Sequence, residues 1–216
     1  KNWMPLYEQV AHTPFFMWDP NHPQAAGQRR SALVQPAIDL GPTLLKHFGL
    51  EPTEHMLGKP LQTVVENDTP VREAAIFGYH GKHVNITDGR YVYLRHPVSP
   101  NNRPLNDYTL MPTAMRGYKP VNEQTNLTAP DRFSFTRGRP LLCIPGPEES
   151  KPKADPEADH LLFDVEQDPD EQQPLDDTDL EQRLCQQMAE LMAECEAPEE
   201  QYQRMGLEAH RPAAVR

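Results

Sequence analysis

The stretch AAIFGYHGKHVNITDGRYVYL, residues 74–94, decides the fold that this sequence predicts. It is rich in β-branched and aromatic side chains, which are typical of strands. Asp88 and Gly89 stand between two such runs, and this dipeptide favours a tight hairpin turn. Tyr91 and Tyr93 then alternate with their neighbours, as one face of a strand requires. We therefore predict antiparallel β-structure over this stretch.

The segment TDLEQRLCQQMAELMAEC, residues 178–195, is predicted to be the one long helix. Thr178 and Glu181 have the spacing of a capping box at its start. Apolar side chains recur on one face and predict a core-facing stripe, made of Leu180, Leu184, Met188, Leu191, Met192 and Cys195. Before the helix, LLFDV at residues 161–165 predicts a last short strand. The predicted fold class is α+β, with a small antiparallel sheet packed by one long helix.

Proline accounts for 24 of the 216 residues, about twice its usual share. Because proline disrupts helix interiors and cannot donate to a sheet ladder, we expect short elements and long ordered loops. Residues 97–147 are predicted to be mostly loop. TPFFMW at residues 13–18 predicts a short buried strand. PAIDLGPTLLKHFGL at residues 36–50 predicts a short helix pair, with Pro42 in the first turn of its second helix.

The acidic residues are concentrated in one segment of a chain whose formal net charge is −11. Residues 148–200 contain 19 of the 32 acidic residues and 3 of the 21 basic ones. No basic helix or stripe with interleaved aromatic residues is present, so nucleic acid is not an expected partner. No apolar run approaches the roughly 18 residues of a spanning helix, so a membrane is not expected either.

The three cysteines cannot all pair, and the absence of a CxxC motif argues against a zinc or redox site. Free thiols favour a reducing compartment, whereas N-x-T triplets at Asn67, Asn85 and Asn126 are weak signals of secretion. The compartment therefore stays open between cytoplasm and periplasm. The chain starts at Lys1 in the middle of a pattern, and we interpret it as a fragment or a processed piece.

The order of three segments along the chain carries information about the family: KNWMPLYEQVAHTPFF at residues 1–16, AIDLGPTLLKHFGL at 37–50 and LLFDVEQDPDEQQPL at 161–175. In this order they resemble the C-terminal part of the type I sulfatases of the alkaline-phosphatase superfamily. GYHGKHVNITDGRYVYL at 78–94 and APEEQYQRMGL at 197–207 look like one bacterial-type branch of that family. The resemblance covers about residues 1–207, nearly the whole chain.

The resemblance implies a division of the chain and an activity. Residues 1–60 would be the C-terminal edge of the α/β catalytic domain, with its last strand and helix. Residues 61–207 would form a C-terminal sulfatase subdomain, and residues 208–216 a flexible tail. The parent enzyme would hydrolyse a sulfate ester of a small molecule or carbohydrate. Its formylglycine nucleophile and its Ca²⁺ would be held upstream of this chain, in the missing N-terminal sulfatase region.

The resemblance also assigns site residues near the start of the chain. Lys1 stands where the family places its sulfate-contacting lysine, a few residues before the pair Tyr7 and Glu8. Its ammonium group would meet a sulfate oxygen and the leaving-group oxygen. His12 would face the same pocket, although a structural role is equally open. Tyr7 and Glu8 are expected to orient this segment.

His80, His83 and Asn85 lie in the predicted β-structure and are the candidate wall of the substrate cleft, contacting the alcohol part of the substrate. Strand alternation places His83 and Asn85 on one face and His80 on the other, unless a bulge at Gly81 changes the alternation. The alternative is that these are ordinary exposed strand histidines.

Other chemistry-bearing residues are interpreted as structural. Cys143 opens the string CIPGP, which has Pro147 where the sulfatase nucleophile motif needs arginine, so we predict a small buried residue. Asp39 is predicted to be a helix-terminus acceptor. The acidic stretch 164–181 lacks the spacing of a calcium loop, so its aspartates are predicted to serve turns and caps: Asp164, Asp168 and Asp170. No metal ligand is predicted in this chain.

Two other function classes stay open. One is a phosphodiester or phosphonate hydrolase of the same superfamily, which would use an upstream threonine or serine nucleophile and a second metal site. The other is a non-catalytic interaction module. An upstream Cys-x-Pro-x-Arg motif would favour the sulfatase.

Overall fold

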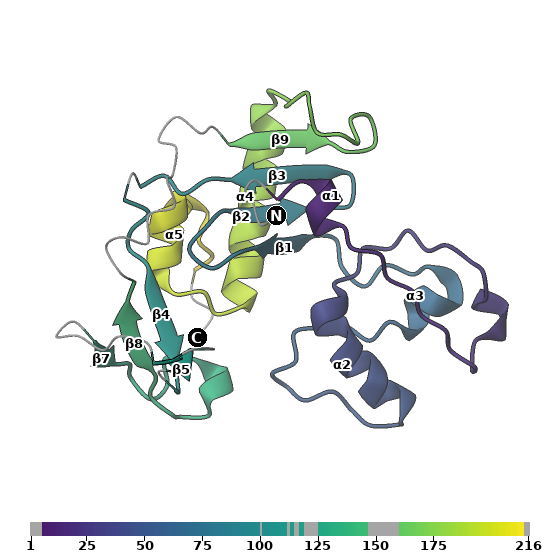
Figure 1. The fold of residues 1–216 in the computed structure, drawn as a ribbon, viewed down its shortest axis with the longest axis horizontal. Helices are drawn as coiled ribbons and strands as arrows, with labels where there is room; N and C mark the ends of the chain where they lie inside the picture. Colours follow the sequence, from purple (N-terminus) through teal and green to yellow (C-terminus); the bar gives the residue numbers. More distant parts are fainter. Residues whose placement is uncertain are drawn as a thin grey trace.

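The computed structural model describes residues 6–99, 101–111, 113–114, 117–118, 125–146 and 160–213. A four-stranded antiparallel sheet carries a long helix on one face, and a three-stranded sheet and a two-stranded ribbon lie beside it (Figure 1). Residues 14–73 form a separate lobe of helices and loops, which we call the N-terminal lobe and which lies to the right in Figure 1. The predicted α+β class is thus confirmed.

The four-stranded sheet contains the predicted β-structure. Its strands pair in the order β1-β2-β3-β9, with bounds Ala75–Gly78, Val84–Thr87, Tyr91–Arg95 and Leu161–Asp164. Asp88 turns the chain between β2 and β3, because its carboxylate accepts the backbone N–H groups of Arg90 at 3.1 Å and Tyr91 at 2.8 Å. Gly89 takes a φ of 97°, which glycine adopts without strain. The predicted hairpin and last strand are confirmed.

The long helix α4, Thr178–Glu194, crosses one face of this sheet, as predicted (Figure 1). Leu184 and Met188 are completely buried against side chains of the sheet that include Ile86 and Tyr93. At roughly 25 cal/mol per Å² of apolar area, each fully buried leucine or methionine contributes about 1.5–3 kcal/mol. The predicted apolar stripe is therefore the main core of the protein.

The two ends of α4 differ from the prediction. The N-cap is Asp177, whose carboxylate accepts the backbone N–H of Leu180 at 3.0 Å, so the proposed capping box starting at Thr178 was wrong. At the other end, Cys195 is exposed and does not belong to the core stripe. The chain turns immediately afterwards at Glu196, whose φ is 54°.

A short helix, α5 at Glu199–Met205, and a 3₁₀ turn, η3 at Glu208–His210, close one end of this core. Tyr202, Met205 and Leu207 are buried there with the residues of α4. Arg95 of β3 holds the segment in place, because its guanidinium donates to the backbone carbonyls of Met205 at 2.7 Å and Gly206 at 3.0 Å.

Residues 97–147 are more regular than the predicted loop. A three-stranded antiparallel sheet is formed in the order β4-β8-β7, with bounds Asn106–Thr109, Leu142–Pro145 and Asn126–Leu127. A ribbon of β5, Thr113–Ala114, and β6, Gly117–Tyr118, and a 3₁₀ turn η2, Ser134–Thr136, accompany it. The two-residue strands are too short to show a period-2 pattern, and β4, with the sequence NDYT, has no apolar alternation, so the sequence did not indicate them.

The N-terminal part contains α1 at Glu8–Ala11, η1 at Pro23–Ala25, α2 at Pro36–His47 and α3 at Gln62–Asn67. The strand predicted at residues 13–18 was wrong, since this segment has no regular secondary structure. Phe16 is 90 % exposed and Trp18 is 77 % exposed, so the segment is not buried by the described residues. Its apolar side chains are available for a surface contact.

The predicted helix pair at residues 36–50 is a single helix, α2, with Pro42 inside it. An interior proline removes the N–H that would bond the carbonyl four residues earlier, here that of Ile38. Gly58 lies directly against this carbonyl, and a Cβ at position 58 would come within 1.9 Å of its oxygen. The absence of a side chain at Gly58 is therefore what allows the loop to cover this part of α2.

Asp39 is the polar anchor of the N-terminal lobe. Its fully buried carboxylate accepts the backbone N–H groups of Gln35 at 2.7 Å and Lys59 at 2.8 Å. It also forms a two-pronged ion pair with Arg72, with both N–O distances at 2.6 Å. Burial alone would raise the pKa of Asp39, but these partners outweigh it and hold the pKa below its usual value. The predicted helix-terminus role is confirmed, and the ion pair adds to it.

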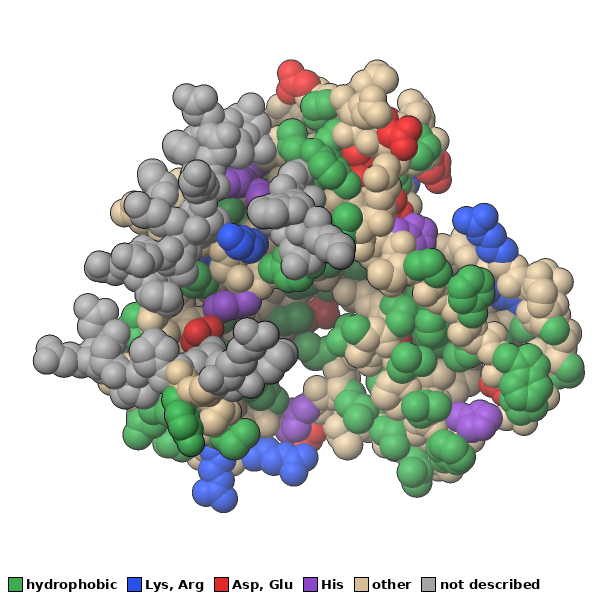
Figure 2. All heavy atoms as spheres, in the orientation of Figure 1, with side chains coloured by type: hydrophobic (Ala, Val, Ile, Leu, Met, Phe, Trp, Pro, Cys, Tyr) green, Lys and Arg blue, Asp and Glu red, His purple; other side chains and the backbone are tan. Residues whose placement is uncertain are grey.

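Large apolar side chains are exposed on the N-terminal lobe. Figure 2 shows hydrophobic side chains spread over much of this lobe, at the right of the view. The exposed set is Phe16, Met17, Trp18, Ile38, Leu40, Leu44, Phe48, Leu50, Met56 and Leu57. Apolar surfaces of this extent usually mark an interaction site. Among the described residues, no helix has the length and hydrophobicity needed to cross a membrane.

Candidate functional site

The candidate site lies on the face of the four-stranded sheet opposite α4. Asn85 of β2 lies across from Leu94, and Val84 across from Arg95, so the same register sets His83 opposite His96. The rings of His83 and His96 meet edge to face, with their centroids 4.7 Å apart. We call His83, Asn85 and His96 the polar patch.

The polar patch contains buried groups without hydrogen-bond partners. Asn85 has no exposed surface, and neither its amide nitrogen nor its amide oxygen has a partner among the described residues. Nδ1 of His83 is buried and equally without a partner. An unsatisfied buried polar group costs about 1–3 kcal/mol, and most such groups in folded proteins are paired. In folded proteins, buried groups of this kind are usually paired by ordered water or another polar group.

The electrostatics make His83 a neutral group. Burial is the main cause that lowers its pKa to about 4, and His96, His160 and Arg204 add to the effect. At neutral pH the imidazole of His83 thus carries no charge and can offer one donor and one acceptor. Beside the neutral amide of Asn85, it suits hydroxyl or amide groups better than an isolated anion.

Arg204 of α5 supplies a buried cation nearby. Only 2 % of its surface is exposed, and burial lowers its pKa to about 10. Its guanidinium donates to the carbonyl of Lys82 at 2.9 Å, to Oδ1 of Asn102 at 2.8 Å and to Oε1 of Gln201 at 2.9 Å. The acceptors are neutral, and the carbonyl of Lys82 belongs to the loop that precedes His83. This hydrogen bond therefore holds that loop against α5.

Acid should destabilise the fold through His83. Its ordinary pKa of 6.5 falls to about 4 in the fold, so the unfolded chain takes up the proton first. The stability that the neutral ring provides is complete above about pH 6.5 and is lost as the pH falls through the window towards 4. We expect the free energy of unfolding, measured by urea denaturation, to fall across this window less steeply in His83→Gln than in the unsubstituted chain.

The substitution Gln182→Ala, at an exposed position of α4, serves as the control, because a glutamine side chain has no ionisable group. It should leave the pH dependence of stability unchanged. Equal slopes for His83→Gln and the unsubstituted chain would mean that the fold does not hold His83 neutral.

His80 does not join the polar patch. It lies in the turn between β1 and β2, where Gly81 takes a φ of 73°, and its side chain is 60 % exposed. Nε2 of His80 contacts Oδ1 of Asp107 at 2.9 Å. The predicted pairing of His83 with Asn85 and the separation of His80 therefore agree with the geometry, although a turn rather than a bulge separates them.

Two other predicted site residues are His12, which the structure describes, and Lys1, which it does not. His12 follows α1 as its C-cap, is 71 % exposed, and its Nδ1 lies 2.5 Å from Oε1 of Glu8. The described residues thus show His12 on the surface. Lys1 lies outside the described residues, so its predicted role stays a prediction.

Two of the segments quoted from the sequence lie in contact. The ring of Tyr7 meets that of Phe163 in β9 edge to face, with centroids 6.0 Å apart. The backbone N–H of Glu8 donates to the carboxylate of Glu171 at 2.5 Å, and Gln9 reaches Asp170 at 3.4 Å. Tyr7 packs against the buried cluster of Val92, Leu94 and Phe163, so the N-terminal segment is held on the face that bears the polar patch.

Cys143 and the aspartates have structural positions. Cys143 is half-buried in β8 opposite Tyr108, and burial raises the pKa of its thiol, which is unfavourable for a nucleophile. The carboxylate of Asp164 accepts backbone N–H groups in the turn after β9, and Asp168 accepts that of Gln173. No group of three or more His, Cys, Asp or Glu side chains among the described residues is arranged to hold a metal ion.

Sequence reasoning missed His96 and Arg204. The hairpin centred on Asp88 and Gly89 sets the pairing of β2 with β3, so counting outward from that turn would have placed His96 opposite His83. No local signal could have indicated Arg204, because it reaches Asn102 from 102 positions further along the chain. No family model and no curated protein matches this chain.

Proposed function

We propose that these 216 residues form the C-terminal part of a sulfatase that hydrolyses sulfate esters. The observation that carries this proposal is the contact between the Tyr7–Glu8 pair and the segment of Phe163 and Glu171. Both belong to segments whose sequence resembles sulfatases, and Glu8 and Glu171 lie 163 positions apart in the chain. A resemblance that is also consistent in space is stronger than one of sequence order alone.

The exposed apolar surface of the N-terminal lobe supports the same proposal. In a complete enzyme this surface would pack against the α/β catalytic domain, with α2 as the helix at that domain's edge. Phe16, Trp18 and Phe48 are each more than 70 % exposed in the described structure. Covering such side chains contributes about 1.5–3 kcal/mol each, which is enough to hold two parts of a protein together.

In this proposal the polar patch forms one wall of the substrate cleft. His83 would bind the alcohol part of the sulfate ester, because a neutral imidazole pairs well with hydroxyl groups, and the carboxamide of Asn85, which has no exposed surface, would support that wall from within. Lys1 precedes Leu6 by five residues, so an extended backbone can carry it at most about 18 Å from that residue. Its ammonium group would stabilise the charge on the sulfate and on the departing oxygen.

The nucleophile and the cation of this reaction would come from residues upstream of this chain. There formylglycine would supply the nucleophile of the reaction, and Ca²⁺ would provide positive charge for the sulfate oxygens. The described residues offer no ligand set that fits a calcium ion, so no step of the reaction is assigned to them through the metal. Their part is to bind and orient the alcohol and to neutralise charge.

The proposal is tested by sequencing the complete reading frame and assaying the full-length protein that it encodes. Its upstream sequence should contain a Cys-x-Pro-x-Arg or Ser-x-Ala-x-Arg type motif, and the protein should hydrolyse 4-nitrophenyl sulfate much faster than bis(4-nitrophenyl) phosphate. The reverse preference, with a threonine or serine nucleophile, would replace the proposal by the phosphodiesterase alternative. A reading frame that starts directly before Lys1 would favour an interaction module.

The 216-residue chain by itself should not turn over 4-nitrophenyl sulfate. The reason is that neither a formylglycine motif nor a calcium ligand set has been assigned to it. Purified chain, assayed for released 4-nitrophenol, should match the rate of buffer alone. Turnover that rises in proportion to chain concentration and disappears on heat denaturation would contradict this expectation.

A further inference from the structure

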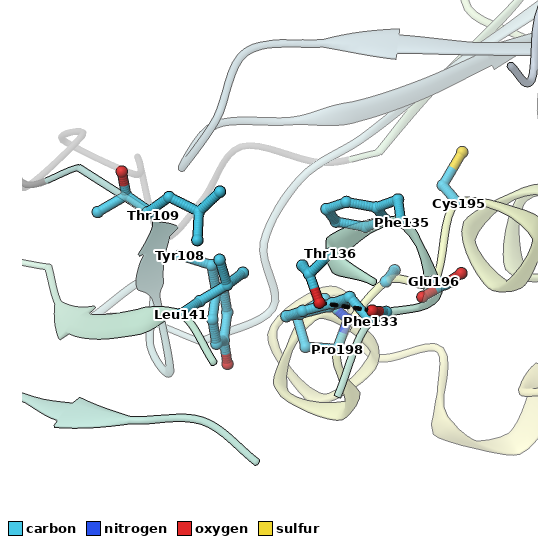
Figure 3. A pocket seen from close by; sticks show the side chains of 11 residues that line it. Tyr108, Thr109, Phe133, Phe135, Thr136, Leu141, Cys195, Glu196 and Pro198 are labelled. Atoms are coloured by element: carbon cyan, nitrogen blue, oxygen red, sulfur yellow. Dashed lines mark hydrogen bonds between the residues drawn. The ribbon is translucent and has the colours of Figure 1, made fainter. Parts of the chain in front are cut away.

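A cavity of about 440 Å³ lies between the β4-β8 pair and the turn that joins α4 to α5 (Figure 3). Small-molecule sites usually enclose about 300–1,000 Å³. The described residues that line the cavity are Tyr108, Thr109, Leu110, Phe133, Phe135, Thr136, Leu141, Cys195, Glu196, Ala197 and Pro198. They come from three separate parts of the chain, so only the folded protein has this cavity.

Aromatic rings form much of the wall. The ring of Phe133 meets that of Tyr108 edge to face at 5.2 Å and stacks on that of Phe135 at 5.4 Å with an angle of 29°. In Figure 3, Tyr108 and Leu141 lie on one side of the space and Phe133 and Phe135 on the other. Phe133 and Leu141 are each 5 % exposed, whereas Phe135 is 53 % exposed. A flat ring entering here would extend an existing aromatic stack.

The polar side chains of the wall already have partners. The hydroxyl of Thr136 donates to the carbonyl of Phe133 at 2.8 Å, and the hydroxyl of Tyr108 donates to the carboxylate of Glu200. The carboxylate of Glu196 accepts the backbone N–H of Ser134 at 2.7 Å. Ring contact is thus the main interaction that the described wall offers to a ligand.

The charge of the wall selects against anions. Glu196 is the one Asp, Glu, Lys or Arg side chain among the described lining residues; the nearby guanidinium of Arg132 lies over the ring of Phe133 at 5.6 Å and pairs with Glu200 at 3.8 Å. An anionic ligand would face the negative charge of Glu196 in a partly desolvated space, where charge repulsion is stronger than in water. An uncharged aromatic ligand avoids this cost.

We propose that this cavity is a binding site for an uncharged aromatic molecule, whose ring lies between Tyr108 and Phe135. The site stands on the three-stranded sheet and the α4–α5 turn, whereas the polar patch stands on the four-stranded sheet. The proposal therefore does not depend on the sulfatase activity, and it applies to the full-length protein as well as to this chain.

The first test compares two probes of similar shape, naphthalene-2-methanol and naphthalene-2-sulfonate, by their fluorescence anisotropy with the full-length protein. The neutral probe should bind with a Kd below about 1 mM, and the anion at least about tenfold more weakly. Glu196→Gln should bring the two affinities to within about threefold. Equal affinities in the unsubstituted protein, or no binding of the neutral probe, would overturn the proposal.

The second test assigns the site. Phe135→Ala should weaken binding of the neutral probe at least about fivefold, because it removes one face of the stack, and the exposed position of Phe135 leaves the fold intact. Tyr79→Ala, at an exposed aromatic position directly after β1, is the matched control and should not change the affinity. An equal loss in both variants would place the binding elsewhere.

The third measurement does not depend on a substitution. Cys195 is exposed and lines the cavity, so iodoacetamide should alkylate it faster than the buried Cys185. A saturating concentration of naphthalene-2-methanol should slow alkylation of Cys195, followed by mass spectrometry, at least about threefold. An unchanged rate under saturating probe would contradict binding in this cavity.

Discussion

Replacing Asp39 by alanine should destabilise the protein by about 3–5 kcal/mol, the usual cost of breaking a buried ion pair. Asp39→Ala leaves the guanidinium of Arg72 without its carboxylate, although the side chain of Arg72 is only 9 % exposed. The substitution also removes the acceptor of the Gln35 and Lys59 backbone N–H groups. Urea denaturation of the full chain at pH 7 measures the effect.

A double variant separates the contribution of the ion pair from that of the backbone hydrogen bonds to Asp39. Asp39→Ala with Arg72→Met should be less destabilised than Asp39→Ala alone, because no buried charge is then left without a partner. Asp176→Ala removes an exposed carboxylate and should change the stability by less than about 0.5 kcal/mol. A loss below about 1 kcal/mol for Asp39→Ala would mean that this ion pair does not hold the lobe together.

In the proposed full-length sulfatase, Lys1→Ala should lower kcat by at least about 10²-fold, the size of effect seen when one charge partner of a transition state is removed. In the proposed reaction, negative charge grows on the leaving oxygen as the sulfur–oxygen bond breaks, and the ammonium group of Lys1 would meet it. The measurement is the steady-state rate of 4-nitrophenyl sulfate hydrolysis.

Lys1→Arg keeps the positive charge and should retain more activity than Lys1→Ala. Both variants should unfold at the same urea concentration as the unsubstituted enzyme, so that a lower rate reports on chemistry rather than on folding. A change in kcat of less than about threefold for Lys1→Ala would show that this residue is wrongly assigned.

Much of the sheet and its covering helix could be predicted because their signals are local. Asp88 and Gly89 place the turn of the hairpin, and alternation along β2 puts His83 and Asn85 on one face. Leu184 and Met188 follow the helical period that buries one face of α4. For these elements the backbone period and the apolar pattern point to the same structure.

Two segments were misinterpreted because contacts with other parts of the molecule, and not their own residues, decide their structure. TPFFMW at residues 13–18 is as apolar as a buried strand, yet Phe16 and Trp18 are exposed. Pro42 should end a helix by its own preference, but α2 continues through it with Gly58 against the backbone. In both cases the local secondary-structure propensity does not decide the structure, because the deciding contacts involve residues elsewhere in the chain.

The sequence by itself determined the hairpin, the last strand and the long helix of this protein, because each follows from a repeat within a few residues. Only the tertiary structure decided where the unsatisfied polar groups lie, that His96 and Arg204 join His83, and that Arg72 neutralises Asp39. It alone also brings Tyr108, Phe133 and Cys195 around one cavity. The physical reason is that burial and pairing depend on distances in space between residues far apart in the chain, and no local period records those distances.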